Sequence, residues 1–543
     1  MRGRTVPGTA ASLGVSTRLT AMTLLAAVPA AWTARAAEPV TAAHSSELPF
    51  SILEFRVLNN SVLATRAVER AVYPHLGPNR SFSDVQAART DLEKAYRDAG
   101  YSTVYVDIPE QSVEDGVVRL SVTEGRLGHV RVTGTRYFSN RHILASVPSL
   151  QSGEVPHFPD VQAQLTRLNS VSPDLQVVPV LKPGAAPGTV DAELKVKDTS
   201  PLHGGVEVNN RYTPDTTHTR LNFDLSYTNL FQKQQSLSLQ YQVAPERPED
   251  ATVYALAYTA PIGTGGDELS ALAVKNNSNV PTIGTLGVLG RGVVSGLHYA
   301  FALPAVGAVH STFTLAADYK DFDQSVLLSD SPGLETPIKY INWSGTFAAL
   351  GSTSRSTTSF DFAVNFGIAG LVNTPSEFEN TRYLAKPNYM YWRLDASHEQ
   401  QLWAGTRLAV RLNGQYTTEP LVQYEQMAIG GVYSVRGYLE AEALGDMGAS
   451  GSVELRTPNW QAPFGIAARQ AYAYVFYDAG IVGIIDPLPQ QDAREHLLSW
   501  GVGVLLIGYG GFDAGIDWAR PLVTTAFTTA RQGRANFHVR YGF

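Results

Sequence analysis

Two short motifs hold the residues of this 543-residue chain that are best suited to specific chemistry. The first is Val435-Arg436-Gly437-Tyr438, and the second is Phe476-Tyr477-Asp478-Ala479-Gly480. An arginine enclosed by protein needs a carboxylate partner, which its planar fork can bind through two parallel hydrogen bonds. Glycine lets the backbone pass close to a packed wall. The two motifs therefore contain the groups that an internal ion pair requires, whether that pair braces a structure or gates it.

Motifs of common enzyme classes are absent from the sequence. It contains no G-x-S-x-G elbow, no H-E-x-x-H pair and no Walker loop. The 12 histidines are scattered, and the lack of cysteine excludes Cys nucleophiles, Cys-ligated zinc and disulfides. A net charge of -7 excludes a generally nucleic-acid-binding surface. We expect no enzymatic activity, no cofactor, no metal and no nucleic-acid partner.

The N-terminus has the pattern of an export signal. Arg2, Arg4 and Arg18 precede an apolar run at 19–32, which an A-x-A site follows at 34–36. This pattern predicts a signal peptide over residues 1–36. No later stretch has 18 uninterrupted apolar residues, so any membrane insertion must use strands.

Two small α+β domains are predicted next. Over residues 49–125 the apolar pattern gives the order strand, helix, helix, strand, strand. Residues 126–199 repeat that order, which predicts an internal duplication. The segment before them, residues 37–48, is too short for a helix plus a linker that crosses a barrel. We therefore expect no N-terminal plug, and a deletion of residues 37–47 should leave channel conductance unchanged.

Period-two alternation replaces the helical patterns over residues 200–543. Leu221, Phe223, Leu225 and Tyr227, for example, alternate with polar residues. The segments run to about ten residues, which is the length of a tilted membrane-crossing strand, and aromatic residues recur near their ends. A closed barrel satisfies every backbone hydrogen bond in hydrocarbon. We predict a transmembrane antiparallel β-barrel of sixteen strands rather than a soluble β-rich domain. The expected strands are 202–212, 219–230, 235–243, 251–260, 267–276, 290–301, 309–320, 338–349, 357–367, 389–400, 405–416, 450–457, 469–478, 497–507, 511–518 and 534–543.

These features together resemble a known family. The repeated α+β order resembles tandem POTRA domains, and the Val435–Tyr438 motif resembles the sixth-loop signature of the outer-membrane-protein-85 superfamily. The motif Phe476-x-Asp478-x-Gly480 resembles its partner on the thirteenth barrel strand. Within that superfamily, the chain resembles the two-partner secretion transporters (TpsB type, ShlB/FhaC/HecB-like). The resemblance implies that a long sixth loop, about 417–449, folds back into the barrel and that Arg436 pairs with Asp478.

The resemblance also implies a function and a location. A TpsB transporter lies in the outer membrane of Gram-negative bacteria, with its POTRA domains in the periplasm. It binds an unfolded exoprotein by strand addition and passes it through the barrel. The terminal Phe543 resembles the aromatic residue by which the barrel assembly machinery recognises such chains. Two alternatives remain open, an assembly factor of the same superfamily and a passive porin.

Overall fold

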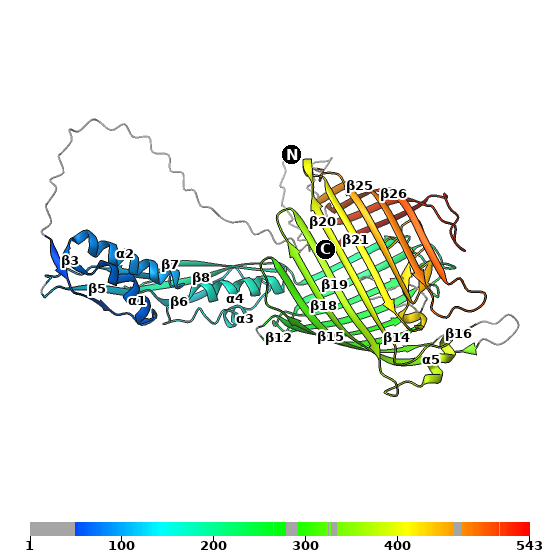
Figure 1. The fold of residues 1–543 in the computed structure, drawn as a ribbon, viewed down its shortest axis with the longest axis horizontal. Coiled ribbons are helices and arrows are strands. Elements are labelled where there is room, and N and C mark those ends of the chain that lie inside the picture. Colours follow the sequence, from blue (N-terminus) through cyan, green and yellow to red (C-terminus); the bar gives the residue numbers. More distant parts are fainter. Residues whose placement is uncertain are drawn as a thin grey trace, which may run out of the picture. The chain divides into compact units, whose positions relative to one another are not determined.

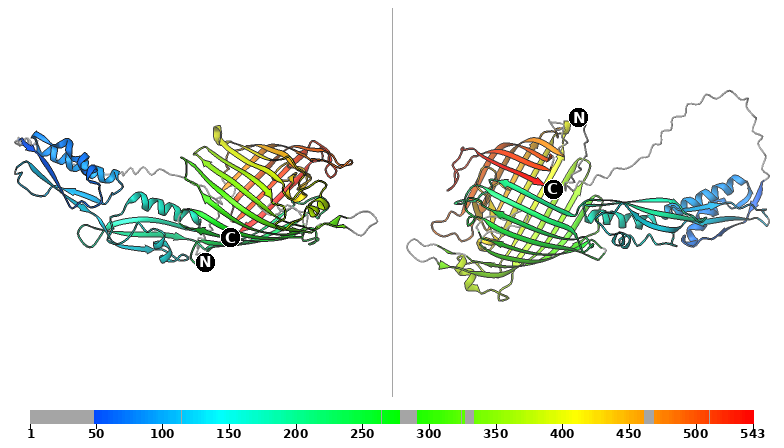
Figure 2. Two further views of the ribbon diagram at one scale, coloured as in Figure 1. Left: turned by 60° about the horizontal axis from the view of Figure 1, so that its bottom comes forward. Right: turned by 180° about the vertical axis from the view of Figure 1, so that it is seen from behind.

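The computed structural model describes eight stretches of the chain. They are residues 49–113, 115–263, 265–277, 291–323, 325–326, 334–460, 469–509 and 511–543. The predicted signal peptide, 1–36, and the short segment 37–48 lie outside these described residues. The described chain divides into two compact units, one that ends at Ser200 and one that begins at Pro201 (Figures 1 and 2).

The first domain of the N-terminal unit packs helices α1 and α2 on a three-stranded sheet of order β2-β5-β4. Strands β2 and β5 are parallel, and β4 is antiparallel to β5. Helix α2 buries Val85, Leu92 and Tyr96 on one face, at helical spacing. Its elements are β1 (Phe50–Ile52), β2 (Glu54–Leu58), α1 (Thr65–Val72), η1 (Tyr73–His75), β3 (Gly77–Arg80), α2 (Phe82–Asp98), β4 (Val104–Asp107) and β5 (Val117–Glu124). The short pair β1–β3 was not predicted from the sequence.

The second domain repeats the order of elements. Its sheet has the order β6-β8-β7, with β6 parallel and β7 antiparallel to the central strand β8. Leu127, Leu165 and Leu194 lie in its core. The elements are β6 (Arg126–Thr133), α3 (Asn140–Ala145), α4 (Phe158–Val171), β7 (Leu175–Pro183) and β8 (Thr189–Asp198).

One carboxylate ties the three strands of this second sheet together. Glu193 on β8 accepts a hydrogen bond from Lys182 Nζ on β7 at 2.6 Å and one from the Thr133 hydroxyl on β6 at 3.0 Å. Arg131 Nη2 lies 3.3 Å from the same carboxylate. The hydrogen bond from Lys182, then that from Thr133, lowers the pKa of Glu193 from 4.5 to about 2.

Glu193→Gln is expected to loosen the second sheet in a pH-dependent manner. Because the folded-state pKa is depressed, the charged carboxylate stabilises the fold above pH 4.5, and this contribution is lost as pH falls toward about 2. At pH 7 the variant should exchange the amide hydrogens of β6 and β8 faster than the parent, in the full-length protein. The difference should shrink between pH 4.5 and 2. Equal exchange at pH 7 would exclude this role for Glu193.

The second unit is a closed antiparallel barrel of sixteen strands, which confirms the predicted fold class (Figure 1). The barrel order is β10-β11-β12-β13-β14-β15-β18-β19-β20-β21-β24-β25-β26-β27-β28-β9. The barrel strands are β9 (Leu202–Asn209), β10 (Arg220–Leu230), β11 (Gln235–Val243), β12 (Thr252–Ile262), β13 (Asp267–Asn276), β14 (Gly292–Ala302), β15 (Val309–Phe322), β18 (Ile338–Ser352), β19 (Ser356–Gly367), β20 (Met390–Gln401), β21 (Arg407–Thr417), β24 (Met447–Arg456), β25 (Gln470–Gly483), β26 (Arg494–Tyr509), β27 (Phe512–Pro521) and β28 (Arg534–Gly542).

An even number of strands puts the start of β9 and the end of β28 at the same end of the barrel, here called the proximal end. The opposite, distal end carries the longer connections. These contain β16 (Ser325–Val326), β17 (Leu334–Glu335), α5 (Pro375–Thr381), η3 (Gln423–Glu425), β22 (Met427–Ile429) and β23 (Ala443–Gly445). A short η2 (Trp403–Gly405) lies in a proximal turn. The predicted strand bounds agree with the structure to within three residues, except at β25, which extends five residues further, to Gly483.

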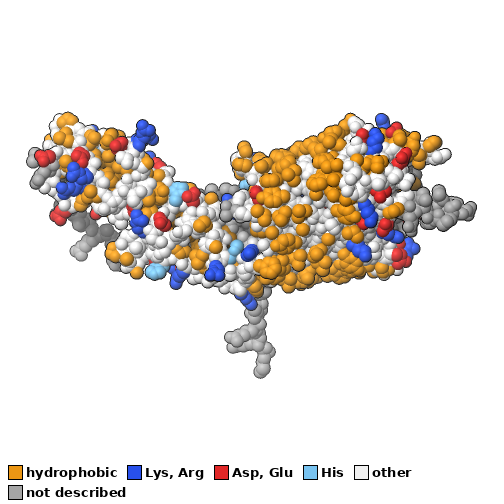
Figure 3. All heavy atoms as spheres, turned by 90° about the horizontal axis from the view of Figure 1, so that it is seen from below, with side chains coloured by type: hydrophobic (Ala, Val, Ile, Leu, Met, Phe, Trp, Pro, Cys, Tyr) orange, Lys and Arg blue, Asp and Glu red, His pale blue; other side chains and the backbone are white. Residues whose placement is uncertain are grey.

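The outer face of the barrel is apolar, as the alternation predicts. Leu225, Leu239 and Leu256 lie on three neighbouring strands and are each exposed by 45–46%. The residues that precede and follow each of them in its strand point inward. Figure 3 shows the result as a continuous hydrophobic band, with charged side chains gathered at one rim. Aromatic stacks such as Phe223–Tyr241–Tyr254 lie on this face. Among the described residues, no helix has the length and apolarity that a membrane crossing demands.

Candidate functional site

A long connection between β21 and β24, residues 418–446, folds back into the barrel. Strands β22 and β23 pair with each other and form the base of this loop. The backbone then turns at Gly430 and Gly431, whose φ angles of 104° and 97° lie in the left-handed region that glycine tolerates. The residues beyond this turn, 432–440, form the tip of the loop. Both sequence motifs meet at this tip.

Arg436 and Asp478 form a buried, bidentate ion pair. Arg436 Nε donates to Asp478 Oδ2 and Nη2 donates to Oδ1, each at 2.7 Å. The backbone N–H of Arg436 donates to Oδ2 at 3.0 Å. The side chain of Arg436 is 5% exposed and that of Asp478 is fully buried. Asp478 and Phe476 face inward from β25, and their neighbours Val475 and Tyr477 face outward.

Three further groups surround the same guanidinium. Nη1 donates to Glu454 Oε1 at 2.7 Å, and Nη2 donates to the Ser452 hydroxyl at 2.9 Å. The Phe476 ring lies against the face of the guanidinium. Arg436 Cζ is 3.5 Å from the centroid of that ring, in the geometry of a cation–π contact. A cation between two carboxylates and an aromatic face is held in one orientation, because low surrounding polarity strengthens each of these contacts.

The other motif residues pack the tip against the wall. Val435 is fully buried beside Gly480, where a Cβ would lie 2.9 Å from Val435 Cγ2. Gly437 has φ = 91°, and a Cβ there would lie 3.1 Å from Ala519. The Tyr438 hydroxyl lies 3.0 Å from the Leu498 carbonyl oxygen and accepts a hydrogen bond from the Val523 N–H at 3.1 Å. The motif glycines thus allow the close approach that seats the loop.

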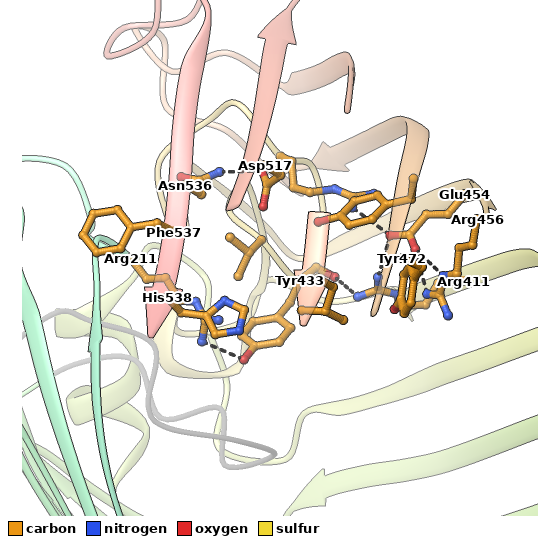
Figure 4. A pocket seen from close by; sticks show the side chains of 14 residues that line it. Arg211, Arg411, Tyr433, Glu454, Arg456, Tyr472, Asp517, Asn536, Phe537 and His538 are labelled. Atoms are coloured by element: carbon orange, nitrogen blue, oxygen red, sulfur yellow. Dashed lines mark hydrogen bonds and ion pairs between the residues drawn. The ribbon is translucent and has the colours of Figure 1, made fainter. Parts of the chain in front are cut away.

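A cavity of about 200 Å³ lies beside the tip and is lined by charged and aromatic side chains (Figure 4). Tyr433 at the tip accepts a hydrogen bond from Arg211 Nη1 at 3.0 Å. On the other side of the cavity, Arg456 Nη2 donates to Glu454 at 2.7 Å, and Arg411 lies 3.7 Å from the same carboxylate. Glu454 therefore balances several arginines of the lumen wall at once.

The sequence motifs did not indicate Glu454 or Ser452. Both face inward from β24, and Ser452 lies directly opposite Asp478 in the register of β24 and β25. Alternation places Glu454 on the inward face of β24, but it does not single it out, because Asp361 and Asp395 are also inward acidic residues of barrel strands. Tyr433 contacts Arg211, 222 positions away, and Tyr438 contacts Leu498, 60 positions away. No local sequence pattern indicates contacts over such separations.

The terminal Phe543 lies at the proximal end, away from this site. Its N–H and carbonyl pair with Gly204 at 3.0 and 3.1 Å, and thereby extend the pairing of β28 with β9. Its ring lies against Gly204, and the side chain is 60% exposed. Within the described part of the chain, no three His, Cys, Asp or Glu side chains are grouped to hold a metal ion.

Comparisons with known proteins give consistent findings. Residues 339–506 match the family of haemolysin secretion/activation proteins ShlB/FhaC/HecB, and residues 50–125 match the ShlB-type POTRA domain. The outer membrane transporter CdiB of Dickeya dadantii (strain 3937) is 24% identical over 437 residues, which cover 76% of this chain and 73% of CdiB. The heme/hemopexin transporter protein HuxB of Haemophilus influenzae is 21% identical, covering 89% and 86% of the two chains. The solved structure of CdiB from Escherichia coli has a TM-score of 0.66 at 18% identity, over 93% of each chain.

Proposed function

This chain is an outer-membrane transporter of the TpsB type, in the ShlB/FhaC/HecB family of the outer-membrane-protein-85 superfamily, and we propose how its parts divide the work of two-partner secretion. Residues 49–125 and 126–199 are the periplasmic POTRA domains, which bind an unfolded exoprotein. Residues 200–543 form the barrel through which that chain passes to the cell surface. The observation that supports this assignment best is the loop tip held inside the barrel by Arg436 and Asp478.

The two three-stranded sheets of the POTRA domains offer edges to an extended chain. The outer strands are β2 and β4 in the first sheet, and β6 and β7 in the second. An edge strand presents unpaired N–H and C=O groups, to which a peptide can add as a further strand. Binding of this kind recognises backbone rather than sequence, which suits a substrate that arrives unfolded. Tyr105, exposed on β4, adds an apolar contact at such an edge.

We assign the other partners from the same arrangement. The outward apolar face contacts the lipid bilayer, and Phe543 is the residue that the barrel assembly machinery recognises. The motif residues Val435, Gly437, Tyr438, Phe476 and Gly480 seat the tip around the Arg436–Asp478 pair. Transport needs neither nucleotide nor catalysis, because folding of the exoprotein outside the cell supplies direction.

Cysteine crosslinking of a stalled exoprotein tests the lumen path, because the chain has no cysteine of its own. Ser238 points into the lumen from β11, as the alternating burial of that strand shows, and the adjacent Leu239, 46% exposed, points outward. We expect Ser238→Cys and Tyr105→Cys to crosslink to the stalled exoprotein. Leu239→Cys is the matched control, which should show no adduct.

Each rival function predicts a different crosslinking result. A passive porin would show no polypeptide adduct at any position. An assembly factor would give adducts at the seam between β28 and β9 instead of at Ser238. Either result would overturn the proposed export path.

A further inference from the structure

A second buried carboxylate fixes the start of the loop to other strands of the barrel wall. Glu425, in η3 near the start of the loop, has a side chain that is only 1% exposed. Its carboxylate accepts hydrogen bonds from Lys320 Nζ at 2.5 Å, Tyr340 Oη at 2.6 Å and Tyr391 Oη at 2.8 Å. Its backbone carbonyl accepts one from Gln415 Nε2 at 2.9 Å. We call these four donors, which come from β15, β18, β20 and β21, the Glu425 socket.

The socket lies within an apolar cluster that joins two distal loops to the barrel wall. The Tyr424 ring stacks on Phe322, with centroids 4.0 Å apart, and Phe378 of helix α5 lies 5.4 Å from the Tyr340 ring. The buried members come from the inward faces of strands β12 to β20 and from loops 368–389 and 418–446. The two loops therefore fill the distal mouth on this side of the lumen.

Asp446 ties the base of the loop together at its other end. Its fully buried carboxylate accepts hydrogen bonds from Arg382 Nη2 at 2.7 Å and Gln426 Nε2 at 3.0 Å. It also accepts the backbone N–H of Leu421 at 3.0 Å and that of Ile485 at 2.7 Å. Arg382 directly follows α5, so one carboxylate joins the helix to both ends of the loop. The base and α5 consequently form one packed element.

The polar groups that bind Arg436 in the tip and those that bind Glu425 lie on different strands of the barrel. Arg436 in the tip binds groups on β24 and β25, whereas the Glu425 socket is on β15, β18, β20 and β21. Gly430 and Gly431 separate the two, and their positive φ angles mark a turn that side chains do not restrict. The Glu425 contacts therefore do not include the Arg436 pair, although β22 and β23 also pack against Val435 and Tyr438 of the tip.

We propose that the Glu425 socket is a second closure of the channel, which keeps the loop base and α5 across the distal mouth independently of Arg436. A carboxylate removed from water is costly unless its partners are in place, so the base is favoured in this one position. Glu425 is thus a positioning residue for the closed state. Conductance is measured without exoprotein, so closure by the Glu425 socket can be tested whether or not the barrel is the export path. The closure thus goes beyond the proposed function.

Single-channel recording of the purified full-length protein in planar bilayers tests this closure. Glu425→Gln preserves size but leaves the Lys320 ammonium, 13% exposed, without its counter-charge. We expect the open fraction to rise by about 10-fold, equivalent to about 1.4 kcal/mol. Glu419→Gln is the matched control, because Glu419 lies in the same loop with a side chain that is 33% exposed and 3.9 Å from Lys386. The control should behave as the parent does.

An unchanged open fraction in a correctly assembled Glu425→Gln protein would overturn the proposal. If that variant does not assemble, Tyr391→Phe replaces it, because only one hydroxyl is lost. Its open fraction should rise by about 5-fold, the value of one net hydrogen bond. No rise in an assembled Tyr391→Phe protein would equally overturn the proposal. In contrast, Arg436→Ala should leave the open fraction low, since the base stays in place.

Discussion

Arg436→Ala is expected to reduce the amount of exoprotein released to the medium by at least about 10-fold, with the barrel still present in the outer membrane. The substitution removes the only cation that the described structure places against Asp478. It also leaves Glu454, 7% exposed, with one partner fewer. Breaking a buried pair on one side costs about 3–5 kcal/mol, because the remaining charge stays out of water.

Loss of the Arg436 ion pair weakens the attachment of the loop tip to the barrel wall, and it leaves the hydrogen bonds between the barrel strands intact. The strand pairing of β24 with β25 does not involve the Arg436 side chain. Secretion should therefore fall much further than barrel abundance, and the two are measured by immunoblots of medium and of membranes. Arg436→Lys should recover little of the loss, because an ammonium cannot make the bidentate contact or lie flat on Phe476.

Arg411→Ala is the matched control for this prediction. Arg411 lines the same cavity, but it is 3.7 Å from Glu454 and 3.5 Å from the Tyr433 carbonyl oxygen, with 36% of its side chain exposed. A pair at this distance, with an exposed arginine, contributes less than about 1 kcal/mol. If Arg411→Ala reduced secretion as strongly as Arg436→Ala, general loss of lumen charge would explain both, and the specific role of the pair would be wrong.

The sequence predicted those parts of the fold that depend on local periodicity. Alternation identified sixteen strands, because each side chain of a barrel strand faces either the lumen or the outside. Alternation also implies that Phe476 and Asp478 lie on one face of their strand, since residues two apart share a face. The end of β25 was placed too early because Ala479–Gly483 continue the ladder with small and apolar residues that carry no clear alternation.

The contacts of the loop depend on register, which the sequence does not report. Glu425 meets Lys320 and Tyr340 only after the chain has closed a barrel, at separations of 105 and 85 residues. Helix α5 was missed for a related reason. It has seven residues inside a long connection, and its burial of Phe378 comes from the neighbouring wall rather than from its own pattern.

Gly501→Ala is expected to destabilise the barrel by about 3 kcal/mol, although it adds a single methyl group. Gly501 on β26 lies opposite Phe476 in the register of β25 and β26. A Cβ at Gly501 would clash with the backbone carbonyl oxygen of Trp518 and with Cζ of Phe476. The carbonyl belongs to the neighbouring strand β27 and cannot rotate away, so either the strands separate or the Phe476 ring moves.

Movement of the ring would also reach the ion pair, because Arg436 Cζ lies 3.5 Å from its centroid. Gly501→Ala should therefore lower both the urea midpoint of the barrel in lipid vesicles and the secretion of exoprotein, without touching a charged group. Gly345→Ala on β18 is the matched control, since the nearest atom to its Cβ would be Phe313 Cζ at 3.5 Å, an ordinary contact. We expect that variant to unfold within about 0.5 kcal/mol of the parent. If both variants lost stability and secretion equally, glycine would be needed for strand flexibility in general. The space beneath Phe476 would then not be what seats the loop.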